Sequence, residues 1–131
     1  MNNANNRIQS YLVTLGITSE QVSEDVWLVN DPDKGLNQII IFVDESLVTI
    51  RCRLMELPPG DRQELSELFE TLLRFNLDLV HGAYALEDHY VVIMDTLELN
   101  TMDLEEFQAS MDAIGLAIAQ HYPVLSKYRH S

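Results

Sequence analysis

Four histidines and one cysteine are the residues in this sequence that most readily bind a metal or act in catalysis. The histidines are His81, His89, His121 and His130, and none lies four residues from another or near the cysteine. A zinc site needs three or four ligands that converge on one ion. We therefore expect His81 and His89 to be exposed turn residues, and we expect no bound metal or other cofactor.

Carboxylates are numerous, but their spacing does not predict a catalytic or calcium-binding site. Asp31, Asp33 and Gly35 match part of a calcium-binding loop, but the later ligands and the bidentate glutamate of such a loop are missing from the sequence. Glu105 and Glu106 fall in the first turn of an expected helix, where negative charge interacts favourably with the helix dipole. These carboxylates are expected to have structural roles.

Motifs for nucleophilic catalysis and phosphate binding are also missing. The sequence contains no Gly-x-Ser-x-Gly and no glycine-rich phosphate loop. Cys52 has no clear activating neighbour and occupies an apolar position of an alternating segment, which is typical of a small buried hydrophobic residue. We therefore predict that the protein is not an enzyme and has no catalytic residues.

Length and composition are typical of a single domain with a substantial core. The 131 residues fit one domain over 1–131, and an apolar content of 47% is enough for a packed interior. The net charge of −13 disfavours nucleic acid and anionic membranes as partners, and it favours basic polypeptides. The same charge is also explained by a solvated acidic surface that keeps the protein in solution.

The cysteine content and the apolar runs bear on the cellular compartment. Because Cys52 is the sole cysteine, no intramolecular disulfide exists, which is compatible with a reduced compartment. The longest apolar run, 39–43, is far shorter than the ~20 residues that span a bilayer. The N-terminus lacks the basic start and apolar run of a signal peptide. We expect a cytoplasmic protein with no part in a membrane.

Periodicity in the first half of the chain predicts one helix and three strands. Residues 5–15 have apolar side chains at helical spacing and precede Gly16, a residue typical of a helix C-terminal cap. A polar connector is expected over 17–24. Strands are expected at 26–29, 37–44 and 47–54, and the last of these alternates most clearly.

The second half predicts a helix, a hairpin and a closing helix. Asp61 and Asp103 each precede a glutamate at capping-box spacing. The first helix, 61–75, carries apolar residues at helical spacing, namely Leu65, Leu68, Phe69, Leu72 and Leu73. A hairpin follows over 82–86 and 90–94, and Pro123 is expected to end or bend the last helix. The fold class is α+β, an antiparallel sheet packed with helices in the order α-β-β-β-α-β-β-α.

Two predicted strands have apolar residues on both faces, within 39–43 and 90–94. This pattern is typical of strands that are covered on both sides. Three helices usually cover only one face of a five-stranded sheet, so the second face would need a further helix layer, a ligand groove or a second copy of the chain. We favour a homodimer, because an identical chain supplies the cover.

The candidate contact residues come from this apolar surplus and from two arginines. Arg51 and Arg53 share one face of a strand, where they either balance acidic neighbours or meet an acidic strand or a second subunit. Trp27 is either a core aromatic residue or a partly exposed anchor for a bound peptide. The full set of expected partner or dimer contacts is Trp27, Ile39, Ile41, Arg51, Arg53, Leu68, Leu72, Tyr90 and Val92.

Several segments together carry a family resemblance. They are the leucine-rich segment 65–76 that ends at an asparagine, Gly82-Ala-Tyr-Ala-Leu86, Tyr90-Val-Val-Ile-Met94, and the acidic helix start 102–107. Segments 8–16 and 26–29 fit the opening helix and strand of the same pattern. Over nearly its whole length, the chain thus resembles the type III secretion chaperone-like family, the Tir chaperone group.

The resemblance implies a small, acidic, cytoplasmic homodimer that keeps an unfolded segment of a secreted protein in solution. It implies no cofactor and no covalent chemistry, and strand addition to a sheet edge is a common route to such binding. We therefore predict a non-enzymatic module that binds a peptide or an unfolded segment of a partner protein. The alternative is a regulatory or scaffolding protein of the same fold that binds a folded partner, because a fold does not define a function.

Overall fold

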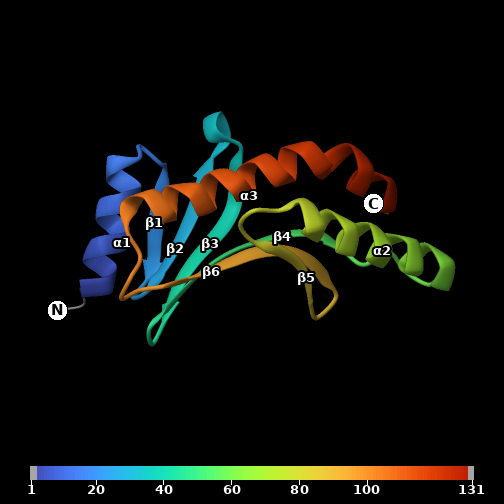
Figure 1. Cartoon of the computed structure of the whole chain (residues 1–131), viewed down its shortest axis with the longest axis horizontal. Helices are drawn as coiled ribbons and strands as arrows, with labels where there is room; N and C mark the ends of the chain where they lie inside the picture. The colour runs from blue at the N-terminus through green and yellow to red at the C-terminus, as the bar shows by residue number, and fades with distance from the viewer. Residues whose placement is uncertain (1–2, 130–131) are drawn as a thin grey trace.

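Six antiparallel strands form one sheet in the computed structural model, which describes residues 3–129. The order across the sheet is β1-β2-β3-β4-β6-β5, so β1 and β5 are its two edges. Hairpins join β1 to β2, β3 to β4 and β5 to β6 (Figure 1). The strands are β1 (Ser19–Ser23), β2 (Val26–Asp31), β3 (Leu36–Asp44), β4 (Leu47–Glu56), β5 (Ala83–Glu87) and β6 (Tyr90–Glu98).

Three helices pack on the same face of this sheet. They are α1 (Asn3–Thr14), α2 (Arg62–Asp78) and α3 (Leu104–Leu125), with short 3-10 helices η1 (Pro32–Lys34) and η2 (Ser126–Tyr128). Figure 1 shows α3 running along the sheet, α1 beside β1 and β2, and α2 at the opposite end beside β5. No helix in the described part of the chain is long and apolar enough to cross a membrane.

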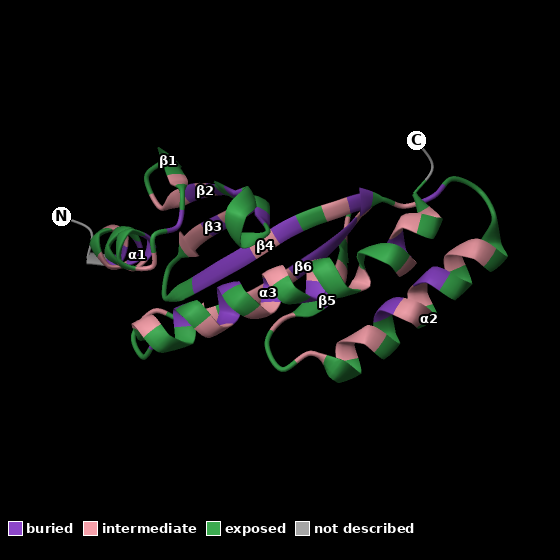
Figure 2. Cartoon of the chain, turned by 90° about the horizontal axis from the view of Figure 1, so that it is seen from above, coloured by how far each residue is buried: buried purple, intermediate pink, exposed green. Residues whose placement is uncertain are grey.

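The core lies between the helices and one face of the strands. On that face Trp27, Ile41 and Ile50 lie in one row across β2, β3 and β4, because these residues are register partners. The helices complete the same cluster of buried side chains with, among others, Ile8, Leu12, Leu68, Phe107, Met111 and Ile114. Figure 2 shows this burial as a purple band along β4 and on the inner sides of the helices.

Aspartate caps define where α2 and α3 begin, as the capping-box spacing predicts. The carboxylate of Asp61 accepts a hydrogen bond from the backbone N–H of Gln63 at 2.9 Å. The carboxylate of Asp103 accepts one from the backbone N–H of Glu106 at 2.7 Å. Each bond satisfies a donor that the first turn of a helix leaves unpaired.

The predicted α+β class is confirmed, and one strand must be added to the predicted order. The segment expected to be a polar connector, 17–24, contains β1, so the observed order is α-β-β-β-β-α-β-β-α. Polar, mostly exposed residues make up β1, and its backbone pairing with β2 holds it in the sheet. Such a strand has no apolar alternation, which is the signal on which a strand prediction depends.

Two element ends also differ from the prediction. Of the two outcomes expected at Pro123, an end of the helix is wrong: α3 continues to Leu125, and the backbone N–H of Ser126 bonds to the carbonyl of Tyr122. Strand β6 continues past Met94 to Glu98, although this extension brings Asp95 into the sheet. The hydroxyl of Ser110 on α3 donates to Asp95 Oδ2 at 2.7 Å, which satisfies the carboxylate between the two layers.

Candidate functional site

Six of the nine predicted contact residues lie in the interior of this chain. They are Trp27, Ile39, Ile41, Leu68, Leu72 and Val92. The indole N–H of Trp27 donates to Gln9 Oε1 of α1 at 3.2 Å, so Trp27 is a core residue that fastens α1 to β2. In this conformation these six side chains are not available to a partner.

The other three predicted residues, Arg51, Arg53 and Tyr90, lie together on the helix-free face of the sheet. Glu87 of β5 bridges the two arginines, with Oε2 2.5 Å from Arg51 Nη1 and Oε1 3.2 Å from Arg53 Nε. The guanidinium of Arg53 lies 4.5 Å from the ring centre of Tyr90, and the register places Val92 between Arg53 and Ala85. The ion-paired arginines thus cover apolar surface that the sequence predicts to be open to a partner.

Exposed apolar side chains lie on several elements, and two of the most exposed, Leu73 and Leu77, lie on α2. Leu68 and Leu72 face the core, whereas Leu73 is 69% exposed and Leu77 is 87% exposed. Residues at i, i+4 and i+8 lie on one side of a helix, so we define the outer α2 stripe as Leu65, Phe69, Leu73 and Leu77. A shallow cavity of about 570 Å³ runs along this stripe between Arg62 and Leu73.

A second apolar hollow separates α2 from the sheet edge. We call it the α2–β5 groove; its volume is about 180 Å³ and its lining is Phe69, Leu72, Leu73, Asn76, Tyr84, Ala85 and Leu86. Leu86 is half exposed at its rim, and Val80 is 87% exposed in the connection from α2 to β5. The outer α2 stripe and the groove form one continuous apolar region, because Phe69 and Leu73 belong to both.

Polar contacts hold the C-terminal turns of α2 against the edge strand β5. The side chain of Asn76 accepts from the backbone N–H of Tyr84 at 2.6 Å and donates to the carbonyl of Tyr84 at 3.2 Å. The ring of Phe75 stacks on that of His121 of α3, with centres 3.7 Å apart and an angle of 2° between planes. Asn76 of α2 therefore binds the edge strand β5, and its neighbour Phe75 contacts α3.

His121 and Tyr84 complete this cluster. The phenol oxygen of Tyr84 lies 2.6 Å from His121 Nδ1. Burial lowers the pKa of His121, and the nearby carboxylate of Asp78 opposes this effect. Burial also raises the pKa of the Tyr84 phenol. Both groups are therefore held neutral, which suits a hydrogen bond from the Tyr84 hydroxyl to the imidazole.

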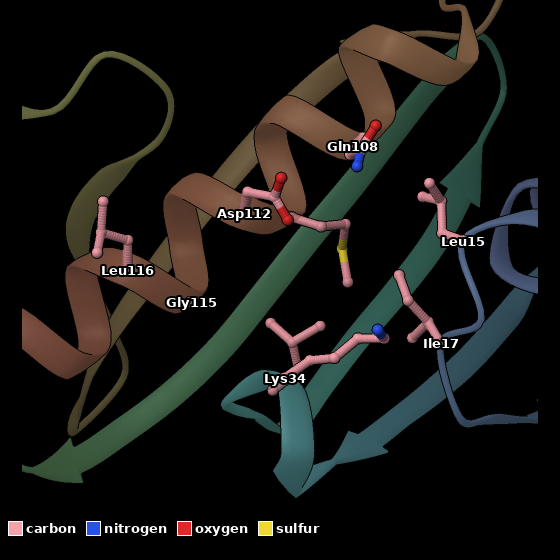
Figure 3. A pocket seen from close by; sticks show the side chains of 9 residues that line it. Leu15, Ile17, Lys34, Gln108, Asp112, Gly115 and Leu116 are labelled. Atoms are coloured by element: carbon pink, nitrogen blue, oxygen red, sulfur yellow. The ribbon is translucent and has the colours of Figure 1, made fainter.

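A cavity of about 310 Å³ lies at the other end of the molecule, between α1, η1 and α3. Its apolar lining includes Leu15, Ile17 and Leu36. Figure 3 shows Gln108 and Asp112 of α3 across the opening from Lys34 of η1. One of its lining residues, Ile17, lies two positions before the edge strand β1.

The side chains that could bind a metal or act in catalysis do not form a cluster in the described part of the chain. Among residues 3–129, no group of three or more histidine, cysteine, aspartate or glutamate side chains is arranged to hold a metal ion. His81 and His89 are exposed, as the sequence predicts, and His130 lies outside the described residues. Cys52 is a buried free thiol; burial raises its pKa to about 11, against the opposing charge of Arg129.

Sequence reasoning missed the exposed half of α2, although a signal was present. Leu65, Leu68, Phe69, Leu72 and Leu73 cover too wide an arc for one buried face of a helix at the edge of a sheet. Leu77 and Val80 extend the apolar surface further. An apolar arc of this width indicates a helix with contacts on two sides.

Comparisons with known proteins agree with this architecture. The family model described as CesT_Tir_1 matches residues 1–131, and the chain belongs to this CesT/Tir chaperone-like family. No curated protein sequence is significantly similar to the chain. The fold is shared with chaperones of type III secretion systems, which confirms the predicted resemblance.

Three solved structures illustrate this similarity. YbjN from E. coli, described as a candidate transcription regulator, has a TM-score of 0.65 at 15% identity, over 90% of each chain. A chain of the ExoU–SpcU complex from the type III secretion system of Pseudomonas aeruginosa has a TM-score of 0.61 at 14% identity, over 89% of this chain and 96% of that one. A chain of the ExsC–ExsE complex has a TM-score of 0.51 at 13% identity, over 94% and 92%.

Proposed function

We propose that this protein is a non-enzymatic, cytoplasmic chaperone-like module that binds an unfolded segment of a partner protein and acts as a homodimer, with residues 1–131 as its single domain. Membership of the CesT/Tir chaperone-like family supports this proposal. So do the net charge of −13, which attracts basic segments, and the free thiol of Cys52, which suits a reduced compartment.

The observation that carries the proposal is the continuous apolar region formed by the outer α2 stripe and the α2–β5 groove. Exposed apolar residues scattered singly are ordinary, but a contiguous patch on one element marks an interaction site. Leu73 and Leu77 are largely exposed and Leu86 is half exposed within this region, and Val80 is exposed beside it in the connection to β5. If the protein bound no partner, this apolar surface would stay exposed to water and would lower the solubility of the protein.

We assign the outer α2 stripe to a second copy of the chain. Two chains that each carry a charge of −13 repel one another, so a self-contact needs a locally balanced surface. The stripe meets this condition, because Arg62 lies at its start and the ion pair between Glu70 and Arg74, at 3.1 Å, lies beside it. A two-fold pairing of this surface buries the stripe against itself.

Sedimentation velocity of wild-type protein and Leu73→Glu tests the dimer. We expect wild type to sediment at twice the chain mass of 15.0 kDa and Leu73→Glu to sediment as a folded monomer. Val13→Glu is the matched control, since Val13 is 68% exposed on α1, and it should remain dimeric. A monomeric wild type, or a dimer that survives Leu73→Glu, contradicts the assignment of the stripe to a second copy.

We assign the partner segment to the opposite edge, β1. The backbone N–H of Asn30 donates to the carbonyl of Thr18 at 3.2 Å, so Thr18 points toward β2. The backbone groups of alternate residues in a strand point to opposite edges, so those of Ser19 and Gln21 point outward, where residues 3–129 supply no further strand. An extended segment can pair with this edge. One of its apolar side chains can enter the cavity between α1, η1 and α3, whose lining includes Ile17 just before β1.

Capture of a permanently unfolded protein tests this function. We expect binding of a reduced, carboxymethylated test protein and no binding of the same protein in its native state. Gln21→Pro removes one outward N–H and should weaken capture, whereas Gln21→Ala keeps the backbone donor and should not. Equal binding of native and unfolded test protein, or equal capture by both variants, would count against the proposal.

The alternative, a regulatory or scaffolding protein that binds a folded partner, draws support from the helix-free sheet face. Arg51 and Arg53 offer hydrogen-bond donors on a surface stiffened by Glu87, and the similar fold of YbjN shows only that this architecture extends to a candidate transcription regulator. Charge reversal at Arg51 and Arg53 should abolish binding to such a partner while capture of unfolded protein is unchanged. If the double reversal alters neither, the alternative fails.

A further inference from the structure

The outer edge of β5 is closed by a side chain instead of a strand. As the last strand of the sheet, β5 has no strand neighbour on its outer side in the described part of the chain. Asn76 takes that place for one residue, because its amide bonds to both the N–H and the C=O of Tyr84. Two bonds from one side chain reproduce the pattern of an antiparallel partner.

A second set of contacts determines whether Asn76 stays in that position. Its neighbour Phe75 stacks flat on His121, and the hydroxyl of Tyr84 reaches Nδ1 of the same imidazole at 2.6 Å. The three elements α2, β5 and α3 thus meet at one ring, that of His121. Loss of the contacts to this ring would leave Asn76 as the remaining polar tie between α2 and the edge strand.

We propose that Asn76, Tyr84 and His121 form a pH-sensitive latch, which keeps the last turns of α2 on the outer edge of β5 and opens when His121 gains a proton. The proposal concerns the free chain and does not depend on the dimer or on the partner segment.

The chemistry of the imidazole explains the trigger. Neutral His121 with its proton on Nε2 accepts the hydroxyl hydrogen of Tyr84 at Nδ1. A proton added at Nδ1 turns this acceptor into a donor, so the Tyr84 hydroxyl has to reverse its own role, and it places a positive charge, which burial disfavours, beside the rings of Phe75 and Tyr84. Among the titratable groups that act on His121, Tyr84 comes from β5 and stays neutral, and Asp78 of α2 only partly compensates for burial of the charge.

Residue-resolved hydrogen exchange on the full chain tests the latch, with protection factors corrected for intrinsic exchange at pH 7.5 and pH 5.5. We expect protection of the Tyr84 amide to be lower at pH 5.5 than at pH 7.5, and complete loss of one hydrogen bond corresponds to a fall of roughly fivefold. The amide of Val92 on the inner strand β6 should change little. Asn76→Ala should expose the Tyr84 amide at both pH values.

Two variants of His121 test whether protonation of this residue causes the pH response. His121→Phe keeps an aromatic ring but cannot titrate, and His121→Gln keeps a hydrogen-bond acceptor and also cannot titrate. Either variant should abolish the pH dependence at Tyr84, and His121→Gln should keep the amide protected throughout. His89→Gln, a change at an exposed histidine, should behave as wild type. Protection at Tyr84 that does not respond to pH in wild type, or that still responds in His121→Gln, overturns the proposal.

Discussion

The indole N–H of Trp27 points at the side-chain oxygen of Gln9, 3.2 Å away, and this bond joins β2 to α1. Trp27 is fully buried, and its register partner Ile41 continues the same buried row. The tryptophan is therefore a spectroscopic reporter of the core and not of a bound partner.

Removal of this side chain should destabilise the fold severely. Trp27→Ala is expected to lower the free energy of unfolding by ~3–5 kcal/mol, because it removes the largest buried side chain and leaves a cavity. Urea titration followed by circular dichroism measures the change. Val13→Ala, at an exposed position of α1, should change stability by no more than ~0.5 kcal/mol. A small loss in Trp27→Ala would mean that α1 does not pack over this residue.

The two faces of α2 should respond in opposite ways to truncation. Leu68→Ala is expected to cost ~2–5 kcal/mol of stability, because Leu68 is fully buried against the sheet. Leu73→Ala, with 69% of the residue exposed, should leave the stability of the monomer nearly unchanged. Urea midpoints measured at a dilution that keeps the chain monomeric separate these effects from any effect on self-association. Equal losses at both positions would contradict the observed orientation of the helix.

Stability should depend on pH through His121. Burial lowers its pKa in the folded state below the ordinary value of 6.5, so the unfolded chain binds more protons in this range. The contribution is fully present above pH 6.5, and it is lost as the pH falls from that value toward the folded-state pKa. Urea midpoints between pH 5 and 8 should therefore fall on the acid side, and His121→Gln should flatten this part of the curve. An unchanged slope in the variant would exclude His121 as the titrating group.

Cys52 should react slowly in the native protein. Its pKa of about 11, compared with an ordinary value of 9.0, lowers the thiolate fraction at pH 8 roughly a hundredfold, and burial further limits access. A thiol-specific chromogenic disulfide measures the rate, with the urea-unfolded chain as the reference. Native labelling at the rate of the unfolded chain would show that the middle of β4 opens readily.

The ion pairs of Glu87 should contribute little to stability. Glu87 is partly exposed beside Arg51 and Arg53, and such pairs are screened by water and salt. Glu87→Gln is expected to lower the free energy of unfolding by less than ~1 kcal/mol, and 1 M KCl should remove most of the difference. Glu70→Gln, which breaks an exposed pair on α2, is the control and should have a smaller effect. A loss that persists in high salt would indicate a packing role for Glu87.

The sequence by itself determined the class of the fold and most of its elements. Alternation in β4 and helical spacing in α2 reflect backbone geometry, because side chains repeat every two residues in a strand and about every 3.6 in a helix. The sequence also predicted the aspartate caps of α2 and α3, because a cap is a hydrogen bond between residues close together in the chain. The family resemblance followed from the same local patterns. Strand β1 was not predicted, because it is short and mostly exposed and has no apolar alternation; backbone pairing with β2 holds it in the sheet.

Tertiary structure alone decided which apolar residues are left for a partner. Leu72 and Leu73 are neighbours of the same type in the sequence, yet one is buried and the other is exposed, because α2 lies at the edge of the sheet and is covered on one side only. The meeting of Asn76, Tyr84 and His121 also joins residues up to 45 positions apart, which no local pattern encodes. Periodicity reports that a side chain is apolar, but what covers it depends on the packing of the whole chain.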